Sequence, residues 1–542
     1  MLANVVRLLR VRGRPRWVQI KIDHRLQARP APRRWFGRKH ASVAELHELV
    51  DELLKDDKLK GVVFRIQSPP RGWASLQNVR ELMQRLSSGG KRVVAHLSGG
   101  SMPEYYLACA ADSIVADEAG PLHLTGIATE SVFWADALAK LGVQAQAEYR
   151  GAYKSFAETF TRTDMSDAHR EAITAILDQI HGELRDAVAS ARNIDGEAAD
   201  ALMTGGPYMA SQAVDAGAID AVLYWDEVAE WLGEDKKTKL GKPSAWAGAR
   251  LHAPRWRPLF NRRAIRVVSL HGAIVTGEGS EFPRKMLGSK AAERQLDRAR
   301  TDSRTAAVVL HIDSRGGSAH ASDLIWRSVV RLARKKPVVA YFDDVAASGG
   351  YYLACAASKI VAQPLTLTGS IGVVGGKLDL SGLYEKIGLH SVVLTRGEAA
   401  AMNHTSRGYS EEERRRLREE VGALYDQFVR KVADGRDMAM EQAEQVAQGR
   451  VWIGSDAAER GLVDELGGAR RAIELAKELA RKKPGQKFRV VDVQASGKRS
   501  GLLARGIVGQ LPVPKQLSDV AELATLADER ALMLPLYNLY WS

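Results

Sequence analysis

Ser348 lies in a sequence context that is typical of a nucleophilic serine. Ser348 lies in the run Ala346-Ala-Ser-Gly-Gly350, after a strand-like run and at the start of a helix-like one. A serine on such a turn exposes its Oγ beside the free backbone amides of a helix N-terminus, and these amides stabilise developing negative charge. Small neighbours leave room for a substrate backbone. Taken alone, the run is also typical of an ordinary turn that begins a helix.

A serine hydroxyl is a weak nucleophile at neutral pH and needs a base. The histidines offer no histidine-acid pair in a suitable context, since His311 falls within a predicted strand and His320 begins a predicted helix. A desolvated lysine can act instead, but lowering its free pKa of about 10.4 by ~3 units costs about 4 kcal/mol. Lys154, with Tyr153 and Phe156 beside it, is the candidate. By itself it is one of 78 Lys and Arg residues.

An internal repeat connects these two residues. Tyr105-Tyr-Leu-Ala-Cys-Ala-Ala111 recurs letter for letter as Tyr351-Tyr-Leu-Ala-Cys-Ala-Ala357, a shift of 246 positions. A period this long indicates duplicated domains and not a solenoid. The shift places the candidate side chains opposite residues of other chemistry: Ser348 opposite Met102, and Lys154 opposite Ala400. The first copy therefore keeps an amine and the second keeps a hydroxyl.

A glycine pair follows a predicted strand in the second copy. Ser314-Arg-Gly-Gly-Ser318 comes after the run Val308–Ile312. Paired glycines can present unobstructed amides, and an oxyanion hole needs such donors about 2.7–3.1 Å from the developing oxyanion. An ordinary glycine turn is the alternative.

The surrounding pattern alternates strands and helices, which predicts an α/β fold with a largely parallel sheet. The predicted strands are short β-branched runs, typical of buried strands: 61–66 and 92–97 in the first copy, and 266–270, 306–312 and 337–341 in the second. Predicted helices cover 76–86 and 321–335, and longer ones cover 167–191 and 411–433. Ser410 and Glu413 have the spacing of a capping box at the start of the last helix.

Charge is concentrated at the beginning of the chain. Of a net charge of +13, residues 1–39 hold twelve Lys or Arg residues against one acid, Asp23. This stretch could contact an anionic membrane, at roughly 1 kcal/mol for each basic residue, or could be a solvated arm. Nucleic-acid binding as the main function is disfavoured, because no reader fold or aromatic-basic platform follows.

Two cysteines, Cys109 and Cys355, occupy equivalent repeat positions inside apolar runs. They are most simply two copies of one buried small residue, since a metal site or a disulfide framework needs more thiols or nearby ligands. The chain has no uninterrupted apolar run of the roughly 18 residues that a membrane-spanning helix needs. We also find no signal-peptide core near its start.

Together the motifs resemble the signal peptide peptidase A family in its long, duplicated form, a group of serine-lysine peptidases in the ClpP/crotonase superfamily. The similarity spans about residues 17–490 and rests on four segments: Ala346–Tyr351 as the nucleophile motif, Leu367–Gly372 as a second block, Ser314–Gly317 as the oxyanion loop, and Tyr149–Lys154 as the lysine segment. Each lies in the expected copy and order.

The resemblance implies a role for each candidate residue. Ser348 would be the nucleophile and Lys154 the general base, Gly317 and Gly349 would offer the oxyanion amides, and Ser370 would orient the lysine. It further implies a serine endopeptidase for apolar peptides such as signal-peptide remnants, with no cofactor and no metal. A homo-oligomer, commonly a tetramer, and association with the inner membrane would follow. The lack of an anchor in the sequence leaves a cytoplasmic location open.

The resemblance also predicts the domain organisation, which contains two tandem ClpP/crotonase-like domains. We expect a basic leader (1–16), a domain carrying the lysine (17–233), a linker (234–263), a domain carrying the serine (264–495) and a tail (496–542). The linker is predicted from a stretch that mixes Lys, Pro and Trp without periodicity.

Two departures from the family pattern keep rival interpretations open. Arg315 stands where the family usually has proline, and the usual N-terminal membrane anchor is replaced by a basic leader. The first departure gives weight to an inactive scaffold that binds peptides without forming an acyl-enzyme. A crotonase-like enzyme acting on acyl-CoA is the second rival, since it would use the same oxyanion logic without a serine nucleophile.

Overall fold

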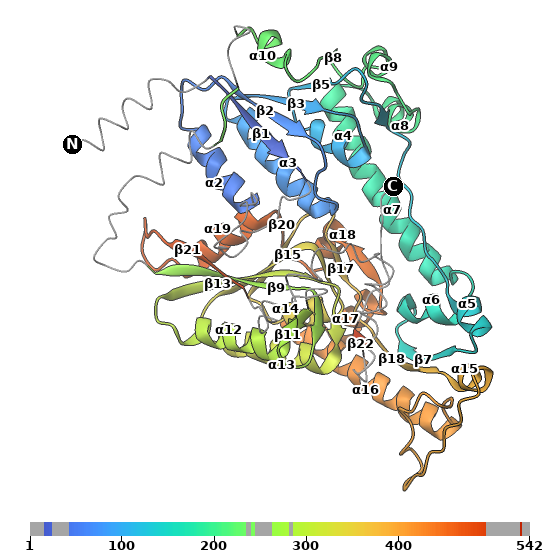
Figure 1. Ribbon diagram of the computed structural model, residues 1–542. Coiled ribbons are helices and arrows are strands. Elements are labelled where there is room, and N and C mark those ends of the chain that lie inside the picture. The colour runs from blue at the N-terminus through green and yellow to red at the C-terminus, as the bar shows by residue number, and fades with distance from the viewer. Residues whose placement is uncertain are drawn as a thin grey trace, which may run out of the picture. The chain divides into compact units, whose positions relative to one another are not determined.

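The computed structural model describes residues 16–23, 43–234, 240–243, 263–280, 286–494 and 532–533, and the statements below concern these residues (Figure 1). Most of the predicted leader, linker and tail lies outside this part, so their boundaries stay predictions. The chain divides into two compact units. Unit 1 comprises Met1–Thr129, Leu177–Phe260 and Tyr540–Ser542, and unit 2 comprises Glu130–Ile176 and Asn261–Leu539.

Unit 1 is built on one parallel sheet of five strands in the order β1-β2-β3-β5-β8. The strands are β1 (Trp17–Ile22), β2 (Gly61–Ile66), β3 (Arg92–Leu97), β5 (Ser113–Ala116) and β8 (Ala221–Val222). The helices are α2 (Val43–Leu53), α3 (Trp73–Ser88), α4 (Met102–Ala108), α8 (Gly196–Thr204), α9 (Ala210–Asp215) and α10 (Val228–Trp231). A small sheet pairs β4 (Gly100–Ser101) with β6 (Leu122–His123). Helix α7 (Asp167–Arg192) contributes residues to both units.

Unit 2 repeats this sheet. Its order β9-β13-β15-β16-β20 matches β1-β2-β3-β5-β8, and every pairing along it is parallel. The strands are β9 (Ala264–His271), β13 (Thr305–Ser314), β15 (Val338–Ala347), β16 (Lys359–Ala362) and β20 (Glu465–Leu466). Strand β21 (Arg489–Gln494) extends the sheet beyond β9, and β17 (Leu367–Gly369) and β19 (Val451–Ile453) extend it beyond β15. The equal topology confirms the duplicated α/β domain that the repeat predicts.

Helices cover both faces of this sheet in unit 2. The inward faces of α12 (Ser289–Thr301), α13 (Ala319–Ala333), α14 (Gly349–Ala354) and α16 (Glu411–Arg436) share one hydrophobic core with β9, β13 and β15. Helix α19 (Ala469–Ala480) packs a second, smaller core against the opposite face. Both faces of the strands are therefore buried, which explains why they are nearly continuous apolar runs.

A second sheet in unit 2 positions the candidate residues. Its order is β11-β12-β10-β14-β22-β18-β7. The strands are β11 (Gly279–Ser280), β12 (Met286–Gly288), β10 (Ala273–Val275), β14 (Gly317–Ser318), β22 (Leu532–Met533), β18 (Val373–Asp379) and β7 (Gln144–Arg150).

Strand β7 belongs to an arm, residues 130–176, that the repeat places in the first copy and that packs as part of unit 2. The arm also holds α5 (Ala135–Lys140), the short 3-10 helix η1 (Ser155–Ala157) and α6 (Glu158–Thr161). Beyond β18 the chain forms α15 (Ser381–Lys386), and after α16 it forms α17 (Met440–Val446) and α18 (Gly454–Glu459). None of the helices in the described part of the chain is long and apolar enough to cross a membrane.

Helix α16 illustrates how local sequence and packing agree. The Ser410 side chain accepts a hydrogen bond from the Glu413 amide at 3.2 Å, and the Glu413 carboxylate accepts one from the Ser410 amide at 2.9 Å, so the predicted capping box is present. Further along, α16 approaches the end of α14 so closely that a Cβ on Gly435 would lie 2.1 Å from the carbonyl oxygen of Cys355. Gly422, in the same helix, has no heavy atom within 4 Å of that position.

These two glycines give a matched test of the packing of α16. Gly435→Ala should lower the free energy of unfolding by about 1–3 kcal/mol through overpacking. Gly422→Ala should raise it by about 0.5–1 kcal/mol, because alanine loses less backbone entropy in a helix. Chemical denaturation measures both changes. Equal effects of the two substitutions would contradict the close contact at Gly435.

Candidate active site

Ser348 sits on the turn that connects strand β15 to helix α14, as the sequence predicts. Its backbone has φ 55° and ψ −117°, a conformation that costs a non-glycine residue on the order of 1–3 kcal/mol. The Ser348 amide donates to the carbonyl oxygen of Gly369 at 2.7 Å, and its carbonyl accepts from the Tyr352 amide at 2.8 Å. These bonds hold the strained turn and fix the direction of the side chain.

Lys154 follows strand β7 and reaches the same place from a different part of the sequence. Strand β7 pairs antiparallel with β18 over seven residue pairs, from Val373 opposite Arg150 to Asp379 opposite Gln144. Since Ser370 lies three residues before the start of β18, this register brings the ends of both segments together. The Lys154 Nζ lies 2.8 Å from the Ser348 Oγ, 3.0 Å from the Ser370 Oγ and 3.0 Å from the Ser370 carbonyl oxygen. We call these three residues the Ser348–Lys154 cluster.

The amine of Lys154 is buried, with 1% of the residue exposed. Burial lowers its pKa well below the ordinary value, because removal from water penalises the charged form. The three oxygen atoms within hydrogen-bond distance belong to hydroxyl and carbonyl groups, and none is a carboxylate that would favour the ammonium form. The arrangement therefore favours the uncharged form of the amine.

The segment Gln448–Arg450 braces the cluster, and sequence reasoning missed it. The Gln448 carbonyl accepts from the Tyr153 amide at 2.8 Å, and the Arg450 carbonyl accepts from the Ser370 amide at 2.7 Å. Between them, Gly449 has φ +75°, and a Cβ there would lie 2.6 Å from the Lys154 amide nitrogen and 2.7 Å from its Cβ. One available signal was Gly205 in the first copy, because in this later part of the repeat the shift is 244 positions, as between Gly217 and Gly461, and places Gly205 opposite Gly449.

The predicted oxyanion residues lie beside each other. A Cβ on Gly349 would lie 3.0 Å from the Gly316 Cα and 3.3 Å from the Gly317 amide nitrogen, so the start of α14 touches the glycine loop. Ser314 fixes this loop: its Oγ donates to the Gly272 carbonyl at 2.7 Å and accepts from the Gly316 amide at 3.1 Å. Gly317 has φ +150°, and a Cβ on it would lie 2.1 Å from the Ile274 carbonyl oxygen.

Arg315, which departs from the family pattern, interacts electrostatically with Asp313. Burial raises the pKa of Asp313 to about 8, assisted by the charges of Asp343 and Asp344, and the Arg315 charge opposes the rise. The arginine therefore lies near a group of carboxyls from β13 and β15. A proline at position 315 would not supply this compensating charge.

A two-residue strand occupies the gap between the oxyanion loop and β18. Strand β22 pairs antiparallel with β14, with Gly317 opposite Met533 and Ser318 opposite Leu532. It also pairs antiparallel with β18, where Val374 stands opposite Leu532. The backbone on both sides of this gap is thus geometrically suited to an extended peptide.

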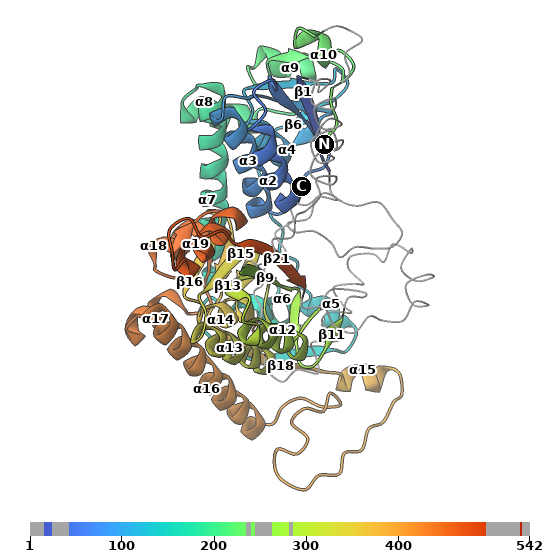
Figure 2. The same ribbon diagram turned by 90° about the vertical axis from the view of Figure 1, so that its left-hand side faces the viewer.

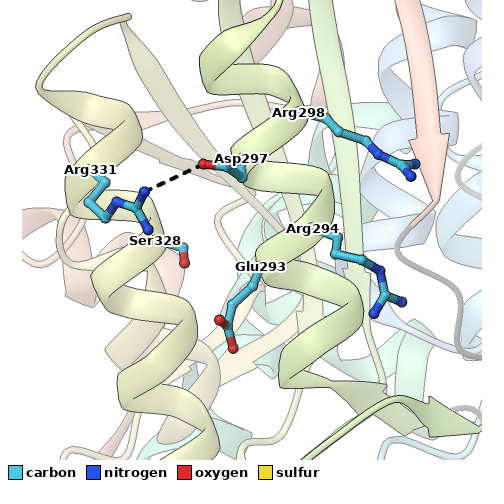
Figure 3. Close-up of a pocket in the computed structure, with 6 residues that line it drawn as sticks. All are labelled: Glu293, Arg294, Asp297, Arg298, Ser328 and Arg331. Atoms are coloured by element: carbon cyan, nitrogen blue, oxygen red, sulfur yellow. Dashed lines mark ion pairs between the residues drawn. The ribbon is translucent and has the colours of Figure 1, made fainter.

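A hollow of about 390 Å³ between α12 and α13 is lined mostly by charged side chains, with Arg331 3.5 Å from Asp297 (Figure 3). None of its lining residues belongs to the Ser348–Lys154 cluster. Within the described part of the chain, no group of three or more His, Cys, Asp or Glu side chains is arranged to hold a metal ion.

Comparisons with known proteins identify the family to which the chain belongs. The model of "Peptidase family S49" matches residues 85–239 and 331–483. The chain is 34% identical over 462 residues to the chloroplastic serine protease SPPA of Arabidopsis thaliana, covering 83% of this chain and 68% of that one. It is 32% identical over 477 residues to Protease 4 of Salmonella typhi, covering 85% and 76%. A mutant ClpP1 from Listeria monocytogenes is a structural match with 18% identity and a TM-score of 0.26, covering 38% of this chain and 94% of that one.

The two family matches, one in each copy, and the long alignments define the class: this protein is a serine peptidase with a duplicated α/β domain. The chain belongs to peptidase family S49.

Gly449 provides a test of how the cluster is held. Gly449→Ala should displace the Lys154 backbone, because the added Cβ would stand less than 3 Å from three of its atoms. We expect peptide hydrolysis to fall by at least about tenfold, since a misplacement of about 1 Å can cost a hundredfold. Steady-state kinetics on an unstructured peptide measures the change.

Gly485→Ala is the matched control, because Gly485 has φ +70° and no heavy atom within 4 Å of an added Cβ. Both variants should lose about 1 kcal/mol of stability from the left-handed backbone. Only Gly449→Ala should lose activity, and equal activity of the two variants would contradict the bracing role.

Proposed function

We propose that the protein is an endopeptidase that cleaves extended, apolar peptides through an acyl-enzyme, with Ser348 as the nucleophile and Lys154 as the general base. The observation that supports this most is the 2.8 Å contact between the Lys154 Nζ and the Ser348 Oγ inside a buried environment. A base within hydrogen-bond reach of a hydroxyl is the requirement for activating a serine.

The hydrogen bonds around the amine match an uncharged lysine. A neutral amino group has two N–H bonds and one lone pair. The two N–H bonds can be donated to the Ser370 carbonyl and hydroxyl oxygens, each at 3.0 Å. In the uncharged lysine the lone pair would then be directed toward Ser348, and the serine hydroxyl would donate to it across the 2.8 Å between the two atoms. Ser370 would thus orient the lysine without touching the substrate.

The proposed reaction balances with these groups and water. The Ser348 Oγ attacks the carbonyl carbon of the peptide while its proton passes to the Lys154 Nζ. When the tetrahedral intermediate collapses, the C–N bond breaks and the lysine returns the proton to the leaving amine. Water then attacks the ester, gives one proton to Lys154, and the proton passes to the departing Ser348 oxygen. The amides of Gly317 and Gly349 would stabilise the oxyanion in both halves of the reaction.

The substrate would bind as a strand between β14 and β18, where β22 lies in the structure. Backbone hydrogen bonds on both sides would hold an extended peptide with little dependence on its sequence. Next to this gap, Phe156 packs against the apolar side chains of β10 and β12, namely Ala273, Val275 and Met286. This favours apolar side chains near the cleaved bond. Signal-peptide remnants have this chemistry, and a relative in Enterococcus faecium is named a putative signal peptide peptidase.

Membrane association and oligomer formation also stay proposals. The basic stretch 1–39 supports contact with an anionic surface through its charge, and membrane-derived peptides would be presented there. The strand-like binding mode does not depend on either property.

The central test replaces each member of the pair. Ser348→Ala and Lys154→Met should each lower kcat/KM for an unstructured apolar peptide by at least about a thousandfold, and the double variant should lose little more. Lys290→Met, at an exposed lysine, should keep normal activity. Circular dichroism establishes that each variant is folded. Turnover retained in either single variant would exclude the mechanism.

A serine-directed phosphonate separates the peptidase from its rivals. Intact-mass measurement should show one adduct on the normal chain and none on Ser348→Ala. A scaffold that only binds peptides, or an acyl-CoA enzyme that does not use the serine, would show no adduct on either chain.

Lys154 also predicts the direction of two pH dependences. Its folded pKa lies below the ordinary value of 10.5. The fraction of neutral base, and with it kcat/KM, should therefore rise with pH through the lowered pKa. Between this pKa and 10.5 the unfolded chain binds more protons than the folded one, so stability should rise with pH relative to Lys154→Met. Denaturant titrations of both proteins at several pH values measure the second effect, and parallel profiles would contradict the lowered pKa.

Deletion of Leu532 and Met533 tests the binding gap. If β22 occupies the place of the peptide, the deletion should lower KM and leave kcat unchanged, because a competing strand is removed while the chemistry is kept. An unchanged KM would show that the peptide binds elsewhere.

A further inference from the structure

Three side chains outside the Ser348–Lys154 cluster form a second polar group beside it. Glu171 lies near the start of α7, and its two carboxylate oxygens accept hydrogen bonds from different partners. The Tyr153 hydroxyl donates to one oxygen at 3.0 Å, and the Arg450 Nη1 donates to the other at 2.7 Å. All three residues belong to unit 2. We call this group the Glu171 tether.

The tether joins the two backbone segments that present the cluster. Tyr153 directly precedes Lys154 in the chain. Arg450 holds the other segment, because its carbonyl accepts a hydrogen bond from the Ser370 amide at 2.7 Å. Two of the three oxygen atoms around the Lys154 Nζ belong to Ser370. The separation of the two tethered segments therefore affects where the amine lies.

Aromatic packing holds the arginine of the tether in one orientation. Its guanidinium carbon lies 4.8 Å from the centre of the Tyr153 ring and 4.6 Å from the centre of the Trp452 ring. A planar guanidinium stacks on aromatic faces in this way, whereas a lysine ammonium does not. The Glu171 side chain is 54% exposed and the Arg450 side chain 20%. An ion pair this exposed adds little to stability, so its main effect is on geometry.

The equivalent positions of the other copy cannot form the tether. Helix α16, seen as one continuous helix in Figure 2, and α7 share a shift of 244 positions from end to end. This shift applies after the start of α7, and the shift of 246 applies before it. The residues opposite the tether have other chemistry: Arg415 opposite Glu171, Gly206 opposite Arg450, and Ala399 opposite Tyr153. The tether is therefore absent from the copy in which alanine replaces the lysine.

Ion pairs that hold the fold recur in both copies. Arg192 lies 2.8 Å from Asp220 in the first copy, and Arg436 lies 2.7 Å from Asp464 at the equivalent positions of the second. Each of these carboxylates also accepts a hydrogen bond from the backbone amide of a strand residue. A pair that stabilises the α/β domain is thus kept twice, whereas the Glu171 tether occurs once, beside the lysine. This distribution favours a role in positioning the lysine over a role in the fold.

We propose that the members of the Glu171 tether are positioning residues for Lys154. The tether keeps the lysine segment at the distance from Ser370 at which the amine also reaches Ser348. It acts through the backbone of both segments and takes no part in proton transfer. This inference rests on the proposed function, in which the lysine is the general base.

Glu171→Ala tests the proposal, with Glu171→Gln as the conservative variant. Loss of the tether should lower kcat for an unstructured apolar peptide by about tenfold, because a small displacement of a catalytic group is costly. KM should change by less than about twofold, since the strands proposed to bind the peptide are untouched. Glutamine can still accept from Arg450 and donate to the Tyr153 oxygen, so this variant should keep at least about half of the normal kcat. Thermal unfolding should be nearly unchanged in both.

The pH profile separates positioning from a simple charge effect. Burial keeps the pKa of Lys154 low. When the tether is lost, the amine regains contact with water, so Glu171→Ala should shift the rise of kcat/KM toward higher pH. Removal of a negative charge alone would favour the neutral amine and shift the rise toward lower pH in both variants. A shift toward lower pH or an unchanged profile would overturn the proposal.

Two further variants control for nonspecific effects. Glu474→Ala removes another exposed ion pair, with Arg470 at 2.6 Å on α19, and should leave kcat and the pH profile unchanged. Equal losses in Glu474→Ala and Glu171→Ala would contradict a specific role. Arg450→Ala combined with Glu171→Ala should lose no more activity than the worse single variant, because both residues act in one group. Additive losses would overturn the shared tether.

Failure of this proposal differs from failure of the proposed function. If Ser348→Ala and Lys154→Met abolish turnover while Glu171→Ala keeps a normal kcat, the lysine is still the base and the tether does not position it. If Lys154→Met keeps its turnover, the proposed function fails and this inference fails with it.

Discussion

The site depends on one energetic constraint, the burial of an amine without a carboxylate. An ammonium group taken out of water costs several kcal/mol even after relaxation. Among the described residues, the surroundings of Lys154 supply three oxygen atoms and no opposing charge, so the neutral form is favoured and the pKa of the amine is lowered. The strained turn at Ser348, the close approach of Gly449 and the pairing of β7 with β18 all serve to hold this amine in place.

Lys154 reaches its buried position on an arm that belongs to the first sequence repeat. Residues 130–176 belong by sequence to the first repeat and by packing to unit 2. The repeat places Ala400 opposite Lys154 and Met102 opposite Ser348, so each chain holds one Ser348–Lys154 cluster.

The core of the fold could be predicted because its signals are local. Strands β2 and β3 coincide with the predicted runs 61–66 and 92–97, since buried parallel strands are continuous apolar runs. The capping box predicted the start of α16. The second sheet could not be predicted, because β7 is mostly polar and β18 contains two adjacent glycines, and both features are weak signals for a strand. Their pairing spans more than 200 residues and leaves no local pattern.

Only part of the candidate site could be predicted from the sequence. Ser348 and Lys154 were distinguished from ordinary residues by the repeat and by the family resemblance, and not by their immediate neighbours. Gly449 escaped notice because its importance lies in an approach to Lys154 from nearly 300 residues away. Arg315 could be recognised as unusual, while its relation to Asp313 needed the structure.

The most direct test of this account is the pKa of Lys154 in the folded enzyme. Chains labelled with carbon-13 at the lysine Cε, in a Ser348→Ala background that prevents self-digestion, allow the signal to be assigned by its absence in Lys154→Met. The account predicts a resonance that titrates well below pH 10.5, apart from the other lysines. A Lys154 signal that titrates with the exposed lysines would contradict it.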